Sequence, residues 1–316
     1  MYENGLEVTG MKAIVTGATG FIGKALCQEL LSKHYDVVAV IRKNSSKRSK
    51  LESMICENSE WKDRLQIVEL DLDDLEKIHT EYKMEADVFY HLAWNGSAGA
   101  DREDFDMQYS NIAYMKKAIW TAKECGCKKI VGAGSQAEYG VVKGVAKEDS
   151  TVPKPFMMYG AAKLAAYQMG KLYAAQIGIK LVWPRIYSVY GVGENAGTLV
   201  SYVVDTLKKG EVPQLSPCEN MWNFMYITDC VRALRKLGEN EETEGIYNVA
   251  SKDTRILKDF VVQIRDIVAP DAELNFGAKQ SDPSRTFYLM PDCSKLDAIW
   301  TGEMVTFGEG IGKKAK

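Results

Sequence analysis

The sequence predicts an α/β protein built around a doubly wound parallel sheet. In the first half of the chain, short β-branched runs alternate with longer segments whose apolar residues recur at helical spacing. Strict alternation of strand and helix is typical of βαβ units, whose right-handed crossovers cover both faces of a parallel sheet. The 316 residues, 46% of them hydrophobic, suffice for one large domain or two unequal ones.

The expected elements follow one another along the chain. The strands predicted in the first half are 12–16, 36–41, 65–70, 87–92 and 129–133. The helices predicted between them are 21–33, 73–83 and 104–125. A long helix over 159–177 and a strand over 180–186 come next. After residue 191 the alternation loosens, and the pattern predicts helices 198–209, 229–238 and 257–268 with strands 223–227 and 245–249.

Composition excludes several classes of protein. Lys and Arg total 40 and Asp and Glu total 43, so the net charge of −3 argues against general nucleic-acid binding. No apolar run approaches the length that crosses a bilayer, and the polar first ten residues, native or not, are no signal peptide. The seven scattered cysteines fit no disulfide framework, and Cys125 and Cys127 lack the second pair of ligands that a metal site needs. We therefore expect a cytoplasmic protein with reduced thiols, no metal and no membrane partner.

A glycine-rich turn joins the first strand to the first helix. A β-branched strand runs into Gly17, Gly20 and Gly23, and an apolar helix follows. Glycines allow backbone N–H groups to approach a pyrophosphate closely, and the N-terminus of the helix adds a favourable dipole. At a first strand–helix junction, the spacing Gly-x-x-Gly-x-x-Gly predicts a Rossmann-type dinucleotide site. We expect residues 11–190 to form this dinucleotide-binding domain, and residues 191–316 to form mainly a substrate-binding lobe with segments that return to the core.

The end of the second strand indicates which dinucleotide binds. An acidic residue at this place normally receives the ribose 2′-hydroxyl of NAD. Here the strand ends at Arg42 and Lys43, and Ser45, Lys47 and Arg48 follow. Because cations suit a 2′-phosphate, the segment favours NADP(H), with NAD(H) as the alternative. A solvated basic loop is the other interpretation of these charges.

A tyrosine and a lysine lie one helical turn apart in the predicted helix 159–177. A free tyrosine has a pKa of about 10, too high for proton exchange near neutrality, but a nearby ammonium lowers it. Tyr159 and Lys163 could therefore exchange a proton with a carbinol or ketone while a hydride moves to or from nicotinamide. Ser135 follows the fifth strand, where open α/β sheets place ligands, and could hydrogen-bond the reacting oxygen. Taken alone, the Tyr159–Lys163 pair is also compatible with an ordinary surface helix, and Ser135 is compatible with an ordinary loop.

Together these motifs resemble the extended short-chain dehydrogenase/reductase family, in particular its nucleotide-sugar epimerase, dehydratase and reductase branch. The resemblance covers residues 11–311. Its marks are Thr16 to Gly23, His91-Leu-Ala93, Ser135 in Ser-x-x-x-Tyr-Gly, Tyr159-x-x-x-Lys163, Pro184-Arg185 with Tyr190-Gly191, and Tyr226-Ile-Thr-Asp229. The resemblance implies that Tyr159 is the acid–base, that Lys163 binds the nicotinamide ribose and tunes Tyr159, and that Ser135 orients the sugar oxygen. His91 and Ala93 would line the cofactor, and we interpret His91 as structural.

The resemblance and the turn chemistry together predict the contact residues. The residues expected at the cofactor are Gly17, Thr19, Gly20, Phe21, Ile22, Gly23, Arg42, Lys43, Ser45, Asp71, Leu72, Leu92, Ala93, Tyr159, Lys163, Pro184 and Arg185. Asp71 and Leu72 would edge the adenine, although Asp71 could equally cap a helix. The residues expected at the substrate are Asn95, Gln136, Ser188, Thr198, Leu199, Trp222 and Arg285.

Departures from the family pattern narrow the reaction. Sugar 4,6-dehydratases carry Asp-Glu directly after the catalytic Ser or Thr, whereas Gln136-Ala137 stands here and lacks the acid and base that eliminate water. Ser188 and Trp222 replace an Asn and an Arg that hold the nucleotide diphosphate in many relatives. The nucleotide therefore stays open, with Arg185, Arg232 and Arg285 as candidates for its phosphates.

The sequence favours an NADPH-dependent reductase of a nucleotide-linked 4-keto-deoxysugar. The segment from Ser135 to Gly140 resembles such reductases of polysaccharide pathways. A nucleotide-sugar 4-epimerase with retained NAD is the alternative, and a non-catalytic NADP-sensing protein is a third. The sugar, the base and the stereochemistry of the product stay open. Relatives often pair two helices per subunit in a homodimer, and 104–125 and 159–177 are the candidates unless their apolar stripes only face the sheet.

Overall fold

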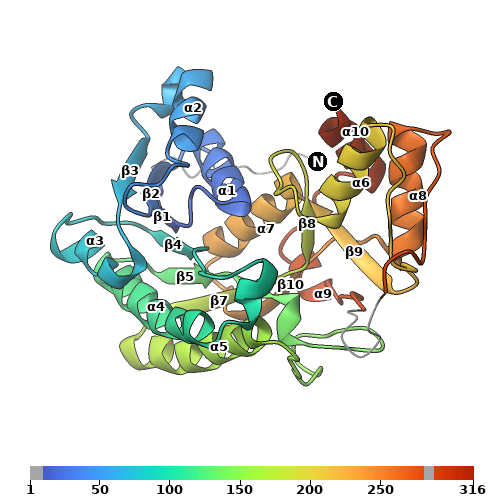
Figure 1. Ribbon diagram of the computed structural model, residues 1–316. Helices are drawn as coiled ribbons and strands as arrows, with labels where there is room; N and C mark the ends of the chain where they lie inside the picture. The colour runs from blue at the N-terminus through green and yellow to red at the C-terminus, as the bar shows by residue number, and fades with distance from the viewer. Residues whose placement is uncertain (1–9, 281–287) are drawn as a thin grey trace, which may run out of the picture. The chain divides into compact units, whose positions relative to one another are not determined.

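The computed structural model describes residues 10–280 and 288–316, and its chain divides into two compact units (Figure 1). The first unit holds the described residues up to Gly134 together with Ala162–Pro184 and Leu234–Ile246. The second holds Ser135–Ala161, Arg185–Ala233 and the described part of Tyr247–Lys316. The division into a cofactor domain and a substrate lobe stays a prediction.

The large sheet confirms the predicted fold class. Its strands run in the order β10-β7-β5-β4-β1-β2-β3, so the order reverses beside β1, as in doubly wound sheets. The pairings from β3 through β2, β1, β4 and β5 to β7 are parallel. The strands are β1 Lys12–Thr16, β2 Asp36–Ile41, β3 Leu65–Glu69, β4 Val88–His91, β5 Lys129–Gly132, β6 Gly134–Ser135 (which pairs with β7), β7 Lys180–Ile186 and β10 Gly245–Val249.

Most predicted helices form within two residues of their expected bounds. The helices are α1 Phe21–Ser32, α2 Ser49–Glu57, α3 Lys77–Thr80, α4 Phe105–Glu124, α5 Met158–Ile177, α6 Leu199–Lys208, α7 Ile227–Glu239, α8 Leu257–Val268, α9 Ser294–Asp297 and α10 Phe307–Ala315. The predicted helix 73–83 is wrong, because only α3 and the short 3-10 turn Leu72–Asp74 form there. Leu75 and Ile78, both fully buried, are the apolar side chains of this segment that enter the core; Leu75 directly follows the 3-10 turn and Ile78 lies in α3, so no continuous helix is needed to place them.

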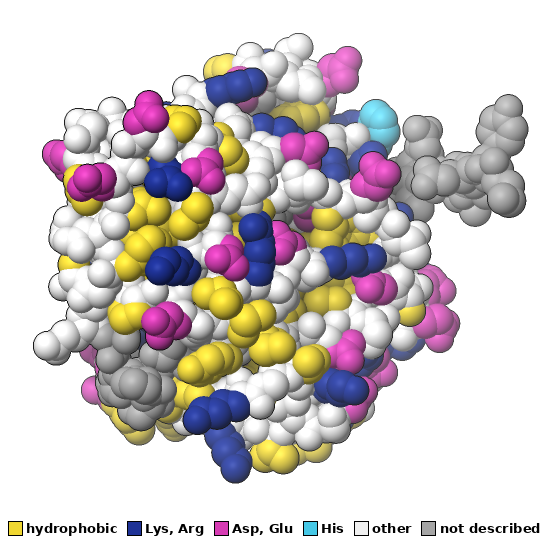
Figure 2. Space-filling model, turned by 90° about the vertical axis from the view of Figure 1, so that its right-hand side faces the viewer, with side chains coloured by type: hydrophobic (Ala, Val, Ile, Leu, Met, Phe, Trp, Pro, Cys, Tyr) yellow, Lys and Arg dark blue, Asp and Glu magenta, His cyan; other side chains and the backbone are white. Residues whose placement is uncertain are grey.

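The surface carries no large patch of one charge on the face that Figure 2 shows. Lys and Arg side chains are interspersed there with Asp and Glu, and hydrophobic side chains lie between them. This mixture agrees with the small net charge of −3. Within the described ranges, no helix combines the length and the apolar character that crossing a bilayer requires.

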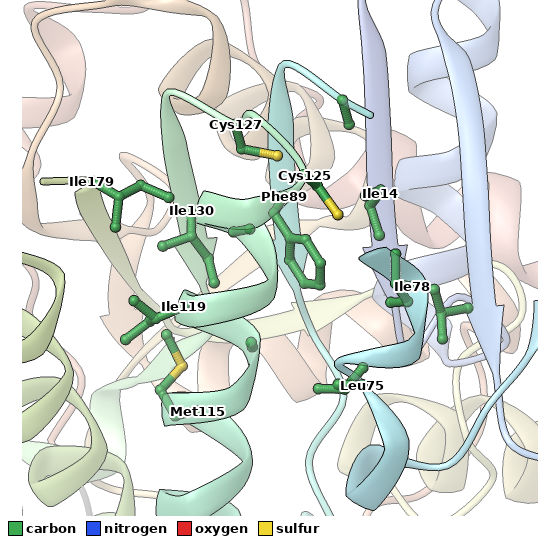
Figure 3. Packing of buried hydrophobic residues seen from close by; sticks show 14 of the residues in the cluster. Ile14, Leu75, Ile78, Phe89, Met115, Ile119, Cys125, Cys127, Ile130 and Ile179 are labelled. Atoms are coloured by element: carbon green, nitrogen blue, oxygen red, sulfur yellow. The ribbon is translucent and has the colours of Figure 1, made fainter. Parts of the chain in front are cut away.

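One hydrophobic core of the first unit lies between the sheet and helices that include α4 (Figure 3). Phe89 of β4 and Ile130 of β5 meet Ile119 of α4, and all three side chains are fully buried. Burying each such side chain stabilises the fold by about 1.5–3 kcal/mol. Cys125, which ends α4, lies in the same core, and burial raises the pKa of its thiol to about 11. All seven cysteines are free thiols.

The second unit has its own small sheet and aromatic core. Its strands run in the order β11 (Thr254–Ile256), β9 (Met221–Tyr226) and β8 (Ser188–Tyr190). Phe307 of α10 packs against Phe260 of α8 and Tyr190 of β8, with ring centroids 4.7 Å and 4.9 Å away. These rings fix α8 and α10 on the sheet.

Candidate active site

The glycine turn after β1 is built from close backbone contacts. Gly17 has φ +69°, and a Cβ there would lie 2.7 Å from the backbone nitrogen of Ala93. A Cβ on Gly23 would lie 2.1 Å from the carbonyl oxygen of Gly17. Gly20 precedes α1 and supplies no side-chain cap to the N–H groups of its first turn. The turn therefore fits a pyrophosphate held by backbone N–H groups, and it lies against Ala93. The contacts of both residues with the cofactor stay a prediction.

His91, at the end of β4, is buried and hydrogen-bonded within the sheet. Its Nδ1 lies 2.9 Å from Thr16 Oγ1, which also accepts the N–H of Ala93 at 3.3 Å. Burial, with a smaller contribution from the charge of Lys163, lowers the pKa of His91 to about 3. The imidazole is therefore neutral at pH 7, which supports its structural interpretation.

Lys163 is held in a fixed place although its side chain is almost fully buried. Its Nζ donates to the carbonyl oxygen of Ala133 at 2.6 Å and lies 3.5 Å from the centroid of the Trp94 ring. The indole Nε1 of Trp94 donates in turn to Gln108 Oε1 at 2.9 Å. A cation over an indole face is a favourable pair, strongest where water is excluded. The sequence gives no sign of this role for Trp94.

Ser135 lies in a tight turn against the start of helix α5. The Oγ of Ser135 accepts the N–H of Ala137 at 3.2 Å, which leaves its own hydrogen available for donation. A Cβ on Gly160 would lie 2.5 Å from the carbonyl oxygen of Ala137, so the helix begins directly against this turn. Tyr159 precedes Gly160 and is 9% exposed.

The Tyr-x-x-x-Lys pair lies on a single continuous helix. Helix α5 runs over Met158–Ile177, so Tyr159 and Lys163 are one turn apart, as predicted. The catalytic role of the pair stays a prediction at this point.

A buried ion pair stands directly behind the Ser135 turn. Glu138 Oε2 accepts from Arg185 Nε at 2.8 Å, and the two side chains are 0% and 1% exposed. Burial is the largest single effect and acts to lower the pKa of Arg185, but Glu138 and Tyr139 together outweigh it and the pKa is raised. The charge of Arg185 is thus balanced inside the chain, and its contact with cofactor or phosphate stays a prediction. The sequence reasoning missed Glu138, although Ser-x-x-Glu is the signature of a capping box.

The basic segment after β2 divides into bound and unbound cations. Lys43 Nζ donates to Asp74 Oδ2 at 2.8 Å, and Arg48 forms ion pairs with Glu52 and Glu69. The exposed guanidinium of Arg42 forms no ion pair or hydrogen bond within the described residues. It is therefore available to a ligand at the end of β2.

Asp71, after β3, does not cap a helix. It precedes the 3-10 turn Leu72–Asp74, but its side chain makes no capping bond there. Its Oδ1 instead accepts the backbone N–H of Lys43 at 3.3 Å. The capping interpretation of Asp71 is therefore wrong, and the carboxylate joins the loops that follow β2 and β3.

Some of the residues predicted to contact the substrate have hydrogen-bond partners inside the protein, and others do not. Thr198 caps α6, because its Oγ1 accepts the N–H of Ser201 at 3.4 Å. Gln136 Oε1 and Trp222 Nε1 are buried and have no hydrogen-bond partner within the described residues. A buried polar atom of this kind is costly unless a ligand satisfies it. Asn95 follows β4, Ser188 lies in β8, Leu199 begins α6, and Arg285 lies outside the described residues.

Comparison with known proteins agrees with this arrangement. Residues 13–250 match the model of the NAD dependent epimerase/dehydratase family. The chain is 25% identical over 288 residues to the uncharacterized UDP-glucose epimerase YtcB of Bacillus subtilis, covering 88% of this chain and 89% of that protein. It is also 25% identical over 285 residues to dTDP-4-dehydro-6-deoxyglucose reductase of Escherichia coli, covering 86% and 85%.

A solved structure shows the same fold. UDP-N-acetylglucosamine 4-epimerase from Methanobrevibacter ruminantium, in complex with UDP-N-acetylmuramic acid, superimposes with a TM-score of 0.85 at 23% identity, covering 98% of each chain. The family match spans most of the chain and includes the glycine turn, Ser135, Tyr159 and Lys163. The resemblance to the extended short-chain dehydrogenase/reductases is thereby confirmed, and the chain belongs to the NAD dependent epimerase/dehydratase family as one of its enzymes.

Proposed function

We propose that this enzyme reduces the 4-keto group of a nucleotide-linked deoxysugar with NADPH. The observation that carries the proposal is Arg42, an exposed guanidinium free of partners within the described residues, at the place where NAD-binding relatives carry a carboxylate. A guanidinium there suits the 2′-phosphate of NADP(H). Because NADPH is consumed in reductions, this preference favours a reductase over an epimerase that retains NAD.

The site residues then have separate tasks. The N–H groups at the start of α1 would hold the pyrophosphate, since the N–H of Gly20 already donates to the carbonyl oxygen of Gly17 at 2.9 Å. The bound cofactor would supply a hydride to the C4 carbon. Tyr159 gives its phenolic proton to the C4 oxygen, so the ketone becomes a carbinol and a phenolate remains. Lys163 stabilises the phenolate until solvent returns the proton.

Ser135 orients the reacting oxygen. Its Oγ already accepts the N–H of Ala137, so its hydrogen can be donated to the C4 oxygen of the sugar. Gln136 carries an amide in place of an acid, and Glu138 is occupied by Arg185 and the N–H of Ser135. No carboxylate of this turn is therefore available to eliminate water, which argues against a dehydratase.

A 4-epimerase is the second candidate, because oxidation and reduction at one carbon need the same Ser, Tyr and Lys. Relatives of both kinds support this choice of two: the Bacillus subtilis protein is named a UDP-glucose epimerase, and the Escherichia coli protein a reductase. Purified enzyme should therefore be mixed with NADPH and a panel of nucleotide-linked 4-keto-6-deoxysugars. We expect NADPH absorbance to fall with the unmodified enzyme and to stay nearly constant with Tyr159→Phe.

Two other outcomes would reject the reductase. Interconversion of UDP-sugars without consumption of added NADPH would identify the epimerase. Tight NADP binding without turnover of either substrate class would identify a sensing protein.

We also propose a homodimer formed through helices α4 and α5, which lie side by side in Figure 1. Phe105 and Tyr109 of α4 are 62% and 64% exposed, with their rings stacked. Met169 and Leu172 of α5 are 62% and 74% exposed. Two copies of such a helix pair could bury these side chains in a four-helix bundle.

The domain roles are part of the same proposal. Residues 11–190 would bind the dinucleotide, and residues 191–316 would mainly bind the nucleotide sugar.

A further inference from the structure

The turn that carries Ser135 is held by a carboxylate that solvent does not reach. Glu138 is 0% exposed, and its Oε1 accepts the backbone N–H of Ser135 at 2.8 Å. Its Oε2 accepts from Arg185 Nε at the same distance. Of these two bonds, a capping box requires only the one from the N–H of Ser135 to the glutamate, and an exposed glutamate could accept that bond equally well. The second bond ties the turn to strand β7.

Stability is a poor explanation for this pair. Burying two charges costs about as much as their attraction returns, and apolar residues of similar volume often replace such a pair without loss. The pair does, however, fix the orientation of the Ser135 turn. With one carboxylate oxygen on Ser135 and the other on Arg185, the backbone of Ser135 has little freedom to rotate or shift.

Arg185 is itself held by other residues of the second unit, to which it belongs. Its guanidinium carbon lies 4.2 Å from the centroid of the Tyr139 ring, and Tyr139 donates its hydroxyl to Asn248 Oδ1 at 2.9 Å. Arg185 Nη1 and Nη2 have no hydrogen-bond partner within the described residues. Glu138 is therefore the carboxylate that balances this guanidinium, and the chain from Ser135 to Asn248 connects the turn with β10.

We propose that Glu138, held by Arg185, is a positioning residue that aims the hydroxyl of Ser135 at the reacting oxygen. The inference rests on the proposed role of Ser135. Glu138 acts through Ser135 and does not touch the substrate. A shift of about 1 Å at a group that orients substrate can cost up to a hundredfold in rate, so the expected effect lies in kcat.

The test is a double-mutant cycle on kcat with a nucleotide-linked 4-keto sugar. Glu138→Gln should lower kcat about tenfold in the otherwise unchanged enzyme, but less than about twofold in a Ser135→Ala background. The KM for the sugar and the Kd for NADPH should change less than about threefold, since neither ligand meets Glu138. The same factor in both backgrounds would show a general structural role and overturn the inference.

Two further variants keep the test decisive. Glu138→Asp retains the charge beside Arg185, so this variant should fold. Its shorter side chain cannot hold both Ser135 and Arg185, so it should lower kcat when Ser135 is present and leave kcat unchanged in the Ser135→Ala background. Glu29→Gln breaks the ion pair with Arg235 in the other unit (2.9 Å) and is the matched control. It should lower thermal stability and leave kcat unchanged; an equal loss of kcat would overturn the inference. If Ser135→Ala alone leaves kcat unchanged, the role of Ser135 fails and the inference fails with it.

Discussion

Cofactor preference should depend on one side chain among several cations. Arg42 is exposed and free of partners within the described residues, whereas Lys43 and Arg48 are engaged by acidic side chains. We predict that Arg42→Ala weakens NADPH binding and leaves NADH binding nearly unchanged, because NADH lacks the 2′-phosphate. The change removes a guanidinium without touching an ion pair of the loop.

The magnitude follows from the exposure of this side chain. A hydrogen bond to a charged group contributes about 1.5–3 kcal/mol, and water and salt weaken it at the surface. We take the lower end, about 1.5 kcal/mol, which corresponds to roughly a tenfold rise in the Kd for NADPH. The Kd for NADH should change less than about threefold. Arg48→Ala should affect both cofactors little, because Arg48 is held by Glu52 and Glu69.

Calorimetric titration at one fixed salt concentration measures all of these values. Raising the salt should shrink the difference between the unmodified enzyme and Arg42→Ala, because the contact is exposed. Equal weakening of NADPH and NADH would refute the reasoning, as would an effect of Arg48→Ala as large as that of Arg42→Ala. Tighter binding of NADH than of NADPH by the unmodified enzyme would reject the cofactor preference itself.

Three other predictions follow from the site and the helices. Tyr159→Phe should lower kcat about a hundredfold to ten-thousandfold with nearly normal NADPH binding, whereas Lys163→Met should weaken both; steady-state rates and calorimetry separate the two. Gly17→Ala should lower the melting temperature and NADPH affinity, because its Cβ meets the backbone of residue 93, whereas Gly312→Ala, in open space, should do neither. Leu172→Lys should yield a monomer in sedimentation at micromolar protein, and an unchanged dimer would place the interface elsewhere.

The fold was predictable where one pattern determined the structure locally. Strands β1, β2, β7 and β10 form over the residues expected, because their β-branched runs are buried in the sheet and end at turns. Helix α8 does so as well. The three-residue strands β8 and β11 were not predicted, since each is defined by pairing with β9 and not by its own sequence. Helix α2 was hidden by its charges, although Leu51 and Met54 show the spacing of a buried helical face.

The candidate site was predictable in kind but not in its supporting contacts. The helix that carries Tyr159 and Lys163 and the turn at Gly17 follow from local spacing. The pairing of Glu138 with Arg185 joins residues 47 apart in sequence, and Trp94 meets Lys163 only through the fold. These pairings depend on the tertiary structure, so no motif could identify them; only the bond from the N–H of Ser135 to Glu138 had a sequence signal, the capping box.

The position of β10 has a consequence for synthesis of the chain. This strand lies next to β7 at the edge of the large sheet, yet about 60 residues separate the two in sequence, roughly 3–12 seconds of translation at 5–20 residues per second. During that interval β7 has no partner from β10, and an unpaired strand edge invites pairing with other chains. A fragment of residues 11–190 would keep that edge open permanently. We therefore expect the edge at β7 to be open to pairing with other chains until the residues of β10 have left the ribosome.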